Sequence, residues 1–387
     1  MKILNLCLCG SYNDGWGYHD NYMSYYHKVI GNDVSIITTP FINDKNSTGY
    51  CFYKSGKYID DNGIKIKREN LKFSNKSKVS FKLRIYKNIY KSIEEEKPDI
   101  IFIHGTQFFD IREVIKYKKR HMNVKIFADN HADYINSAKN IFSKNILHKI
   151  IWKYGIKKLI PYCEKFYGVT PLRCDFLVDM YNIPREKIEL LVMGADDSKI
   201  NFKNKNNIRS EIRNSLLIND DDFVIITGGK IDNFKNIDKV MEVVDKFNDK
   251  HIKLIVFGSV NKDIKDRIDI LSQSPYIRNV GWISSEKVYD YFLASDLAIF
   301  PGTHSTLWEQ ACGTGLPCIF KKWDGMTHVD VGGNCIFIEG NSTEAIDKAI
   351  KSVIYNKNVY DKMKKIAIEK GIIEFSYKKI AEKSIKS

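Results

Sequence analysis

The first half of the chain alternates short apolar runs with amphipathic segments. The apolar runs have the length of buried strands and cover 2–9, 34–39, 99–104, 124–129, 165–170 and 188–193. Between them, apolar residues recur at helical spacing over about 20–30 and over 79–94. Strands of this kind separated by helices predict a parallel sheet with helices on both faces.

The same pattern begins again after a polar stretch, 197–209, which is rich in Asn and Lys and predicts a linker. Further strands are predicted at 223–229, 252–258, 296–302 and 317–320, with a short one that ends at Val280. Helices are predicted near 236–249, 262–272 and 285–294, and from about Leu307. We therefore expect an α/β fold with two doubly wound, Rossmann-like domains, 1–196 and 197–370, facing each other across a cleft that binds ligands.

The composition is that of a globular protein, with 43% hydrophobic and 28% charged residues. The apolar runs are far shorter than the ~18–20 residues that span a bilayer. The first strand lacks the extended basic region of a signal peptide. The eight cysteines contain no Cys-x-x-Cys pair. We therefore expect a cytoplasmic protein with buried, reduced thiols.

The net charge of +14 is concentrated in the first half of the chain. Residues 65–91 contain ten Lys and Arg and one acid, Glu69, with aromatic residues interleaved. Such a stretch fits an anionic membrane surface or a lipid pyrophosphate, and a solvated face explains it equally well. A membrane partner would make the protein peripheral on the inner face of the cell membrane. Nucleic acid is not an expected partner, because no known nucleic-acid module follows from the pattern.

The segment 227–244 combines two glycines with two lysines where a predicted strand ends. Gly228 and Gly229 let the backbone approach a ligand closely. Lys230 and Lys235 stand before a predicted helix and could neutralise a pyrophosphate. The alternative is a glycine turn with exposed lysines, which is common in so basic a chain.

A second motif, 300–320, places a polar loop and a helix after a predicted strand. Thr306 and Glu309 have the spacing of a capping box, in which Glu309 supports the helix N-terminus. A carboxylate at this place could instead accept hydrogen bonds from two ribose hydroxyls. The spacing alone leaves both roles open.

In order along the chain, these and other motifs resemble the glycosyltransferase group 1 family, the retaining family 4 enzymes of GT-B fold. The matching residues are Gly15-Trp16-Gly17, His131 in ADNHADY, LLVMGAD (190–196), Lys230 with Lys235, NVGWIS (279–284), EQACGTGLP (309–317) and Phe375-Ser376-Tyr377. The resemblance covers nearly the whole chain. It implies a GT-B fold in which the final helix, about 371–387, packs back on the first domain.

The resemblance implies a role for each matched residue. Lys230 and Lys235 would stabilise the charge that develops on the leaving nucleoside diphosphate, and His131 would contact the donor sugar or the acceptor. Glu309 would bind the ribose. The other donor-binding residues would be Gly17, Gly229, Trp282, Ile283, His304, Ser305, Thr306 and Leu307. No cofactor or metal is expected, since the lysines and a helix N-terminus serve the diphosphate and no Asp-x-Asp motif follows a strand.

One departure from the family lies between Pro301 and Glu309. This loop is about four residues shorter than in the family, and it contains no acid, so the family's first Glu is missing. Residues 303–306 stand in its place. The donor sugar and the stereochemical outcome therefore stay open. An inverting variant would need a general base, for which Asp20, His131 and Asp133 are candidates.

The resemblance implies transfer of a sugar from a nucleotide-diphosphate sugar to a lipid-linked or polysaccharide acceptor. The expected setting is the synthesis of bacterial surface polysaccharide, lipopolysaccharide or capsule. Two alternatives use the same fold. One is an isomerase like UDP-N-acetylglucosamine 2-epimerase, which needs no acceptor. The other is a non-catalytic nucleotide-sugar-binding protein.

Overall fold

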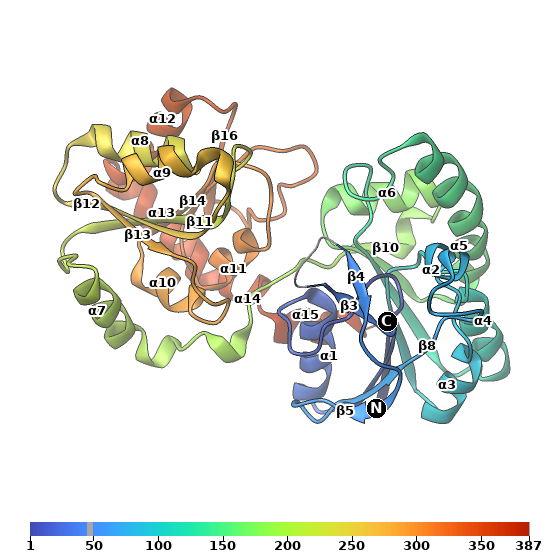
Figure 1. Cartoon of the computed structure of the whole chain (residues 1–387). Coiled ribbons are helices and arrows are strands. Elements are labelled where there is room, and N and C mark those ends of the chain that lie inside the picture. Colours follow the sequence, from blue (N-terminus) through green and yellow to red (C-terminus); the bar gives the residue numbers. More distant parts are fainter. Residues whose placement is uncertain (45–48, 387) are drawn as a thin grey trace. The chain divides into compact units, whose positions relative to one another are not determined.

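The computed structural model describes residues 1–44 and 49–386, which form two compact units (Figure 1). The first unit comprises Met1–Val192 and Ile380–Ser387, and the second comprises Met193–Lys379. In the part of the chain that is described, no helix combines the length and the apolar content that crossing a bilayer requires.

The first unit is built on one eight-stranded sheet with the strand order β10-β9-β8-β7-β1-β2-β6-β5. Its strands are β1 (Lys2–Cys7), β2 (Asp33–Thr38), β5 (Gly56–Ile59), β6 (Lys65–Arg68), β7 (Ile100–His104), β8 (Lys125–Asn130), β9 (Lys165–Gly168) and β10 (Ile188–Leu190). All neighbouring pairs are parallel except β5 with β6. The strand order reverses between β1 and β7, where ligands bind in sheets of this kind. A separate antiparallel pair joins β3 (Phe41–Asn43) to β4 (Tyr50–Phe52).

Of the two helices predicted in the first half, the one over 20–30 is confirmed by α1 and the one over 79–94 is not. The helices of the first unit are α1 (His19–Val29), α2 (Lys78–Leu83), α3 (Ile89–Glu96), α4 (Ile111–Arg120), η1 (Ser143–Trp152), α5 (Lys153–Leu159), η2 (Ile160–Tyr162), α6 (Pro171–Tyr181) and η3 (Arg185–Lys187). The single helix predicted over 79–94 is wrong. Arg84 has a φ of 53° and ends α2, and Tyr86 then forms a bridge with Leu71 before α3 begins. Of the residues that gave the helical spacing, Ile85, Tyr86 and Ile89 are buried, whereas Phe81 is exposed.

The chain returns to the first unit at its C-terminus, within α15 (Tyr377–Ser384). The change of unit falls at Ile380, rather than at about 371 as expected. His27 on α1 lies 2.9 Å from the Ser384 hydroxyl, and both side chains are buried. Burial, with the nearby His104 and His19, lowers the pKa of His27 to about 3.

This histidine makes the stability of the protein sensitive to acid. The unfolded chain binds a proton on His27 near pH 6.5, whereas the folded chain does so only near pH 3. The free energy of unfolding should therefore be unaffected by His27 above pH 6.5. It should fall by about 1 kcal/mol per pH unit as the pH drops through this interval. Urea unfolding at pH 7.5 and pH 4.5 measures the loss. His27→Gln should reduce it, whereas His121→Gln, at an exposed position, should leave it unchanged; an equal loss in both variants would contradict the assignment.

The second unit contains a six-stranded, all-parallel sheet with the order β13-β12-β11-β14-β15-β16. The strands are β11 (Phe223–Ile231), β12 (Ile252–Val260), β13 (Ile277–Gly281), β14 (Leu297–Phe300), β15 (Cys318–Lys321) and β16 (Cys335–Ile338). The order reverses between β11 and β14, which brings the ends of these two strands together. The glycine-lysine segment follows one of them, and the polar loop follows the other. Each unit has its own buried apolar core.

The second unit has helices near each predicted position and also within the predicted linker. They are η4 (Asp197–Lys199), η5 (Phe202–Asn204), α7 (Lys205–Ser215), α8 (Ile237–Phe247), η6 (Lys262–Ile264), α9 (Lys265–Leu271), α10 (Val288–Ala294), α11 (Leu307–Gly313), α12 (Thr343–Ile354), α13 (Lys357–Ile366), η7 (Ala367–Gly371) and α14 (Ile372–Glu374). The predicted linker 197–209 is therefore partly helical. Arg209 and Arg213 of α7 both form ion pairs with Asp296, which fixes this helix to the second unit.

Candidate functional site

In the second unit, two glycines near the end of β11 allow close packing where the strand order reverses. A Cβ on Gly228 would lie 2.4 Å from the Phe257 carbonyl oxygen, so no side chain fits there. Gly229 has a φ of +112°, and a Cβ on it would lie 2.9 Å from Leu307. The predicted donor-binding residues Gly229 and Leu307 are thus neighbours.

The polar loop after β14 packs directly on the segment that carries Lys235. The Lys235 ammonium donates to the Thr303 carbonyl at 2.6 Å, and the Thr303 amide donates to the Phe234 carbonyl at 3.2 Å. Gly302 allows this approach, since a Cβ there would lie 2.4 Å from the Lys235 Cα. Burial lowers the pKa of Lys235 below its ordinary value. A small cavity of about 10 Å³, roughly the size of one water molecule, lies between the lysine and this loop.

Lys230 occupies a different environment. Its side chain is exposed on β11, where its backbone pairs with Ser259. Lys235 is half-buried and held by the loop. The convergence of both ammonium groups on one diphosphate therefore stays a prediction, with Lys235 the better positioned of the two.

Glu309 is completely buried and accepts hydrogen bonds from two histidines. His304 Nε2 lies 2.7 Å from Glu309 Oε1, and His328 Nε2 lies 2.8 Å from the same oxygen. Burial alone would raise the pKa of Glu309, but the two histidines outweigh burial and lower it. The second oxygen, Oε2, is buried and has no hydrogen-bond partner among the described residues. Glu309 therefore holds a charge that orients both imidazoles.

The capping box predicted for Thr306 and Glu309 is wrong. Thr306 has helical backbone angles and its side chain makes no capping bond, because Glu309 turns inward to the histidines. The helix that begins here, α11, has seven residues. Ser305 precedes it and accepts the Trp308 amide through its carbonyl, so its hydroxyl does not cap the helix.

Trp282 and Ile283, predicted to meet the nucleotide base, follow β13. Trp282 is 73% exposed and Ile283 is half-buried. An exposed indole on a short loop is free to stack on a planar ligand. Neither residue contacts Lys235 or Glu309 through a hydrogen bond or ion pair among the described residues, so their role stays a prediction.

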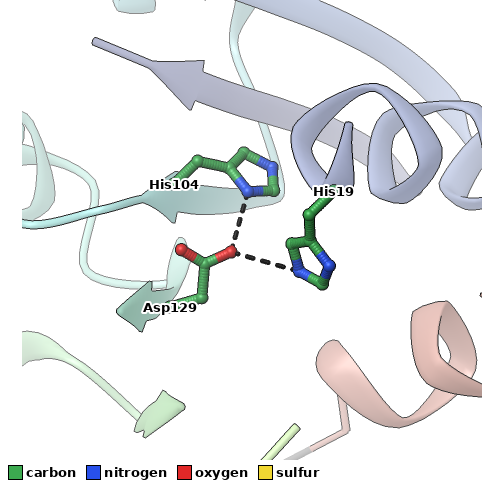
Figure 2. Close-up of side chains that lie close together, drawn as sticks. All are labelled: His19, His104 and Asp129. Atoms are coloured by element: carbon green, nitrogen blue, oxygen red, sulfur yellow. Dashed lines mark hydrogen bonds and ion pairs between the residues drawn. The ribbon is translucent and has the colours of Figure 1, made fainter. Parts of the chain in front are cut away.

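In the first unit, three side chains meet at the carboxyl end of the sheet (Figure 2). Asp129 lies near the end of β8, His104 ends β7, and His19 begins α1. His104 Nδ1 donates to Asp129 Oδ2 at 2.8 Å, and His19 Nε2 lies 3.5 Å from the same oxygen (Figure 2). All three side chains are buried. Figure 2 shows the two histidines approaching one carboxylate from a strand and from a helix.

Asp129 is the centre of this cluster. Its other oxygen, Oδ1, accepts the Gly105 amide at 3.0 Å and lies 3.5 Å from His131 Nε2. Burial would raise the pKa of Asp129, but His104 and His131 lower it well below its usual range. Burial would likewise lower the pKa of His104, but Asp129 raises it. Each group thus favours the charged form of the other.

His131 is the member of this cluster closest to solvent, with 34% of its side chain exposed. Its ring lies 4.9 Å from that of His19.

Asp133, a candidate base for an inverting reaction, accepts hydrogen bonds from two backbone amides and from the Arg173 guanidinium. These bonds make it a structural residue. Gly17 packs against Tyr22, whose hydroxyl would lie 2.8 Å from a Cβ at that position.

Three groups of side chains have the spacing of metal ligands within the described residues. They are His19 with His104 and Asp129, His304 with Glu309 and His328, and Asp221 with Asp222 and His251. In the first two groups, hydrogen bonds within the group already satisfy most of these atoms. Histidine and carboxylate ligands suit zinc and similar ions.

The sequence interpretation missed Asp129, His19 and His328 as site residues. Asp129 could have been found, because it and His104 end two adjacent predicted strands, and the ends of parallel strands meet at one edge. His328 has no such signal, since it lies in a loop without periodicity. His19 falls at the start of a predicted helix, where an inward-facing histidine looks like an ordinary core residue.

Most of the second unit matches a known protein family. Residues 208–370 match the family model described as "Glycosyl transferases group 1". Mannosylfructose-phosphate synthase of Agrobacterium fabrum is 19% identical over 257 residues, which are 62% of this chain and 54% of that protein. The chain spans about half the length of the curated relatives it matches.

Solved structures show the same fold over the whole chain. A glycosyltransferase from Rickettsia africae has a TM-score of 0.67 at 15% identity, covering 99% of this chain and 96% of that one. An Anabaena protein in complex with UDP-glucose has a TM-score of 0.63 at 12% identity, with 99% and 98% covered. A putative UDP-N-acetylglucosamine 2-epimerase from Listeria monocytogenes has a TM-score of 0.60 at 12% identity, with 98% and 94% covered. The expected GT-B fold of two Rossmann-like domains is therefore confirmed, and it is shared by transferases and an epimerase.

Proposed function

We propose that the chain transfers a sugar from a nucleotide-diphosphate sugar to an acceptor, which the match of residues 208–370 to the group 1 glycosyltransferase model supports. The acceptor is lipid-linked or a polysaccharide, and the setting is bacterial surface polysaccharide, lipopolysaccharide or capsule synthesis. The observation that carries this proposal is the packing of Lys235 against the loop after β14. That packing fixes a cation where the strand order reverses.

The residues around Lys235 suit a leaving diphosphate. A fixed ammonium can stabilise the negative charge that grows as the sugar–phosphate bond breaks. Gly229, which has no side chain and is only half-buried, lets phosphate oxygens approach the β11 backbone. Lys230 adds a second, mobile cation on the same strand. We infer that these cations serve in place of a metal ion.

The proposal is tested with purified protein and a panel of nucleotide sugars that differ in base and sugar, in the presence of EDTA. A bound donor should raise the melting temperature, because ligand at 100 times its Kd adds about 2.7 kcal/mol of stability. Release of nucleoside diphosphate should then depend on an added acceptor. Conversion of the donor without acceptor would establish the epimerase alternative, and binding without any conversion would establish the non-catalytic one.

A second part of the proposal concerns where the protein acts. We propose that the first unit binds the anionic inner face of the cell membrane. Besides the basic stretch 65–91, residues 134–163 contain six lysines and no acid. Along η1 and before it, large apolar side chains are exposed, including Ile141 at 82% and Ile150 at 62%. Exposed apolar residues among lysines are typical of a helix that lies at a membrane interface.

Charge reversal on this face should release the protein from acidic vesicles. Each lysine near an anionic surface contributes about 1 kcal/mol, so Lys139→Glu/Lys144→Glu/Lys149→Glu should weaken vesicle binding by at least about 10²-fold. Cosedimentation with vesicles containing phosphatidylserine measures the change. The matched control is Lys357→Glu/Lys362→Glu/Lys365→Glu, on α13 of the second unit, which should keep full binding. Equal binding of both triple variants would contradict the membrane proposal.

A further inference from the structure

The largest cavity described in the first unit lies beside the carboxyl ends of β1 and β2. It has a volume of about 660 Å³ and opens between α2 and η1. Its floor is apolar, with Phe41 from β3 and Leu147 from η1. This volume is within the range of small-molecule sites. The cavity is distinct from the histidine cluster, which contributes none of the residues that line it.

The rim of the cavity is strongly cationic. Lys76, Lys78, Lys82 and Arg84 all line it, and no aspartate or glutamate is among the described lining residues. The surrounding segment, 70–92, has seven Lys and Arg and no acid. Cations gathered on a concave surface without counter-charges attract an anion.

Arg84 is held in place rather than left mobile. It has left-handed backbone angles, with φ at 53° and ψ at 60°, which costs a non-glycine residue about 1 kcal/mol or more. Its guanidinium donates to the Gln107 carbonyl and lies 5.8 Å from the Trp152 ring. The same break that ends α2 thus orients a planar cation, with donors left over, toward the cavity. Such a group suits a phosphate.

An apolar surface continues outward from the cavity. Phe81 lines it and is exposed, and Lys82 places its ammonium 4.0 Å from the Phe142 ring. Phe142 and Ile146 are exposed next to it, toward the face of η1 that we assign to the membrane. A ligand could therefore place a charged group among the four cations and an apolar tail along this surface.

We propose that this cavity binds a phosphate-bearing lipid, with its phosphate among Lys78, Lys82 and Arg84 and its hydrocarbon chain along Phe81 and Phe142. Under the proposed function, on which this assignment of a role rests, the lipid is the acceptor. The lipid then carries the sugar-accepting group into the first unit while its hydrocarbon chain remains in the bilayer. The acceptor class is thereby narrowed from lipid-linked or polysaccharide to anionic lipid.

The binding is tested by titration calorimetry of the full chain with octyl phosphate, octanol and inorganic phosphate, without any nucleotide. Octyl phosphate should bind at one site. Its affinity should be at least about tenfold higher than that of octanol or inorganic phosphate, because only octyl phosphate contacts both the cations and the apolar surface. Equal affinity for inorganic phosphate would mean that the site recognises a free anion and would overturn the lipid assignment.

Variants connect the binding to the cavity. Lys78→Ala/Lys82→Ala should weaken octyl phosphate at least about tenfold, and Arg84→Gly, which tolerates the same backbone angles, should do so as well. Lys116→Ala/Lys119→Ala on α4 removes two exposed lysines elsewhere in this unit and should change nothing. Unchanged affinity in both cavity variants would overturn the proposal.

The same samples separate this inference from the proposed function. Nucleotide-sugar binding measured in parallel reports on the second unit alone. If a nucleotide sugar binds and octyl phosphate does not, the cavity assignment fails and the transferase proposal stands. If octyl phosphate binds through Lys78 and Lys82 but no nucleotide sugar binds, the lipid site stands and the transferase proposal fails.

Discussion

Replacing Lys235 with alanine is expected to lower the turnover number by about 10²-fold or more, as for the loss of one charge-stabilising group in a transition state. Lys235 is the cation that the structure fixes beside the loop after β14, at 2.6 Å from the Thr303 carbonyl. A mobile lysine would lose conformational entropy when it binds the diphosphate, whereas Lys235 has already lost most of it. The effect should therefore fall on kcat more than on KM.

Two comparisons distinguish this charge effect from a change in structure. Lys239→Ala removes a lysine that contacts the Asn341 carbonyl from the exposed side of α8, and it should keep full turnover. Lys235→Arg keeps the charge and should retain part of the activity. The melting temperature of each variant shows whether the loop is still in place. Normal turnover by a folded Lys235→Ala protein would reject the assigned role.

The buried strands at 99–104 and 252–258 could be predicted from the sequence because each is a short apolar run between turns. β5 (GKYI) and β6 (KIKR) were missed because they are short and carry lysines. Arg84 shows where this reasoning fails. Apolar spacing continues across 79–94, and only a left-handed residue, for which arginine gives no signal, divides the two helices. The prediction of a linker over 197–209 failed for a related reason. The helix that forms there, α7, is held by ion pairs of Arg209 and Arg213 with Asp296, which lies far along the chain.

The candidate site could be predicted in part. Gly229 lies near the end of β11 and Lys235 comes four residues after it, so their position follows from the strand itself. The environment of Glu309 could not be predicted, because His328 reaches it from a loop 19 residues further along. A spacing of three residues between Thr306 and Glu309 is compatible with a cap and with an inward carboxylate. Whether Glu309 caps the helix or turns inward depends on whether buried hydrogen-bond donors lie near it, and this is decided by the tertiary structure.

The second large effect is expected in the first unit, for Asp129→Asn. Asparagine has the shape of aspartate, but it removes the negative charge that His104 faces at 2.8 Å. Breaking a buried ion pair in this way costs about 3–5 kcal/mol of stability, because the remaining charge is left without its partner. Urea unfolding at pH 5.5 measures the loss. The exposed Asp175→Asn should lose less than about 0.5 kcal/mol.

The pH dependence gives this prediction its direction. In the folded protein the pKa of Asp129 is lowered and the pKa of His104 is raised. The aspartate's contribution to stability is therefore present above about pH 4 and is lost as the pH falls through its folded pKa. The histidine's contribution is present below about pH 6.5 and is lost as the pH rises through its folded pKa. Between these limits both groups stabilise the fold. The difference in the free energy of unfolding between the native protein and Asp129→Asn should therefore be largest in this pH range.

A substitution of His131 can distinguish the contribution of this cluster to stability from its contribution to turnover. It also approaches Asp129, at 3.5 Å, but it is partly exposed and is not the main partner of the carboxylate. His131→Gln should therefore leave most of the stability in place while lowering turnover, because the imidazole next to solvent is the one that can reach a substrate. If Asp129→Asn unfolds at the same urea concentration as the native protein at pH 5.5, the buried pair is not charged. The electrostatic account of this cluster would then have to be abandoned.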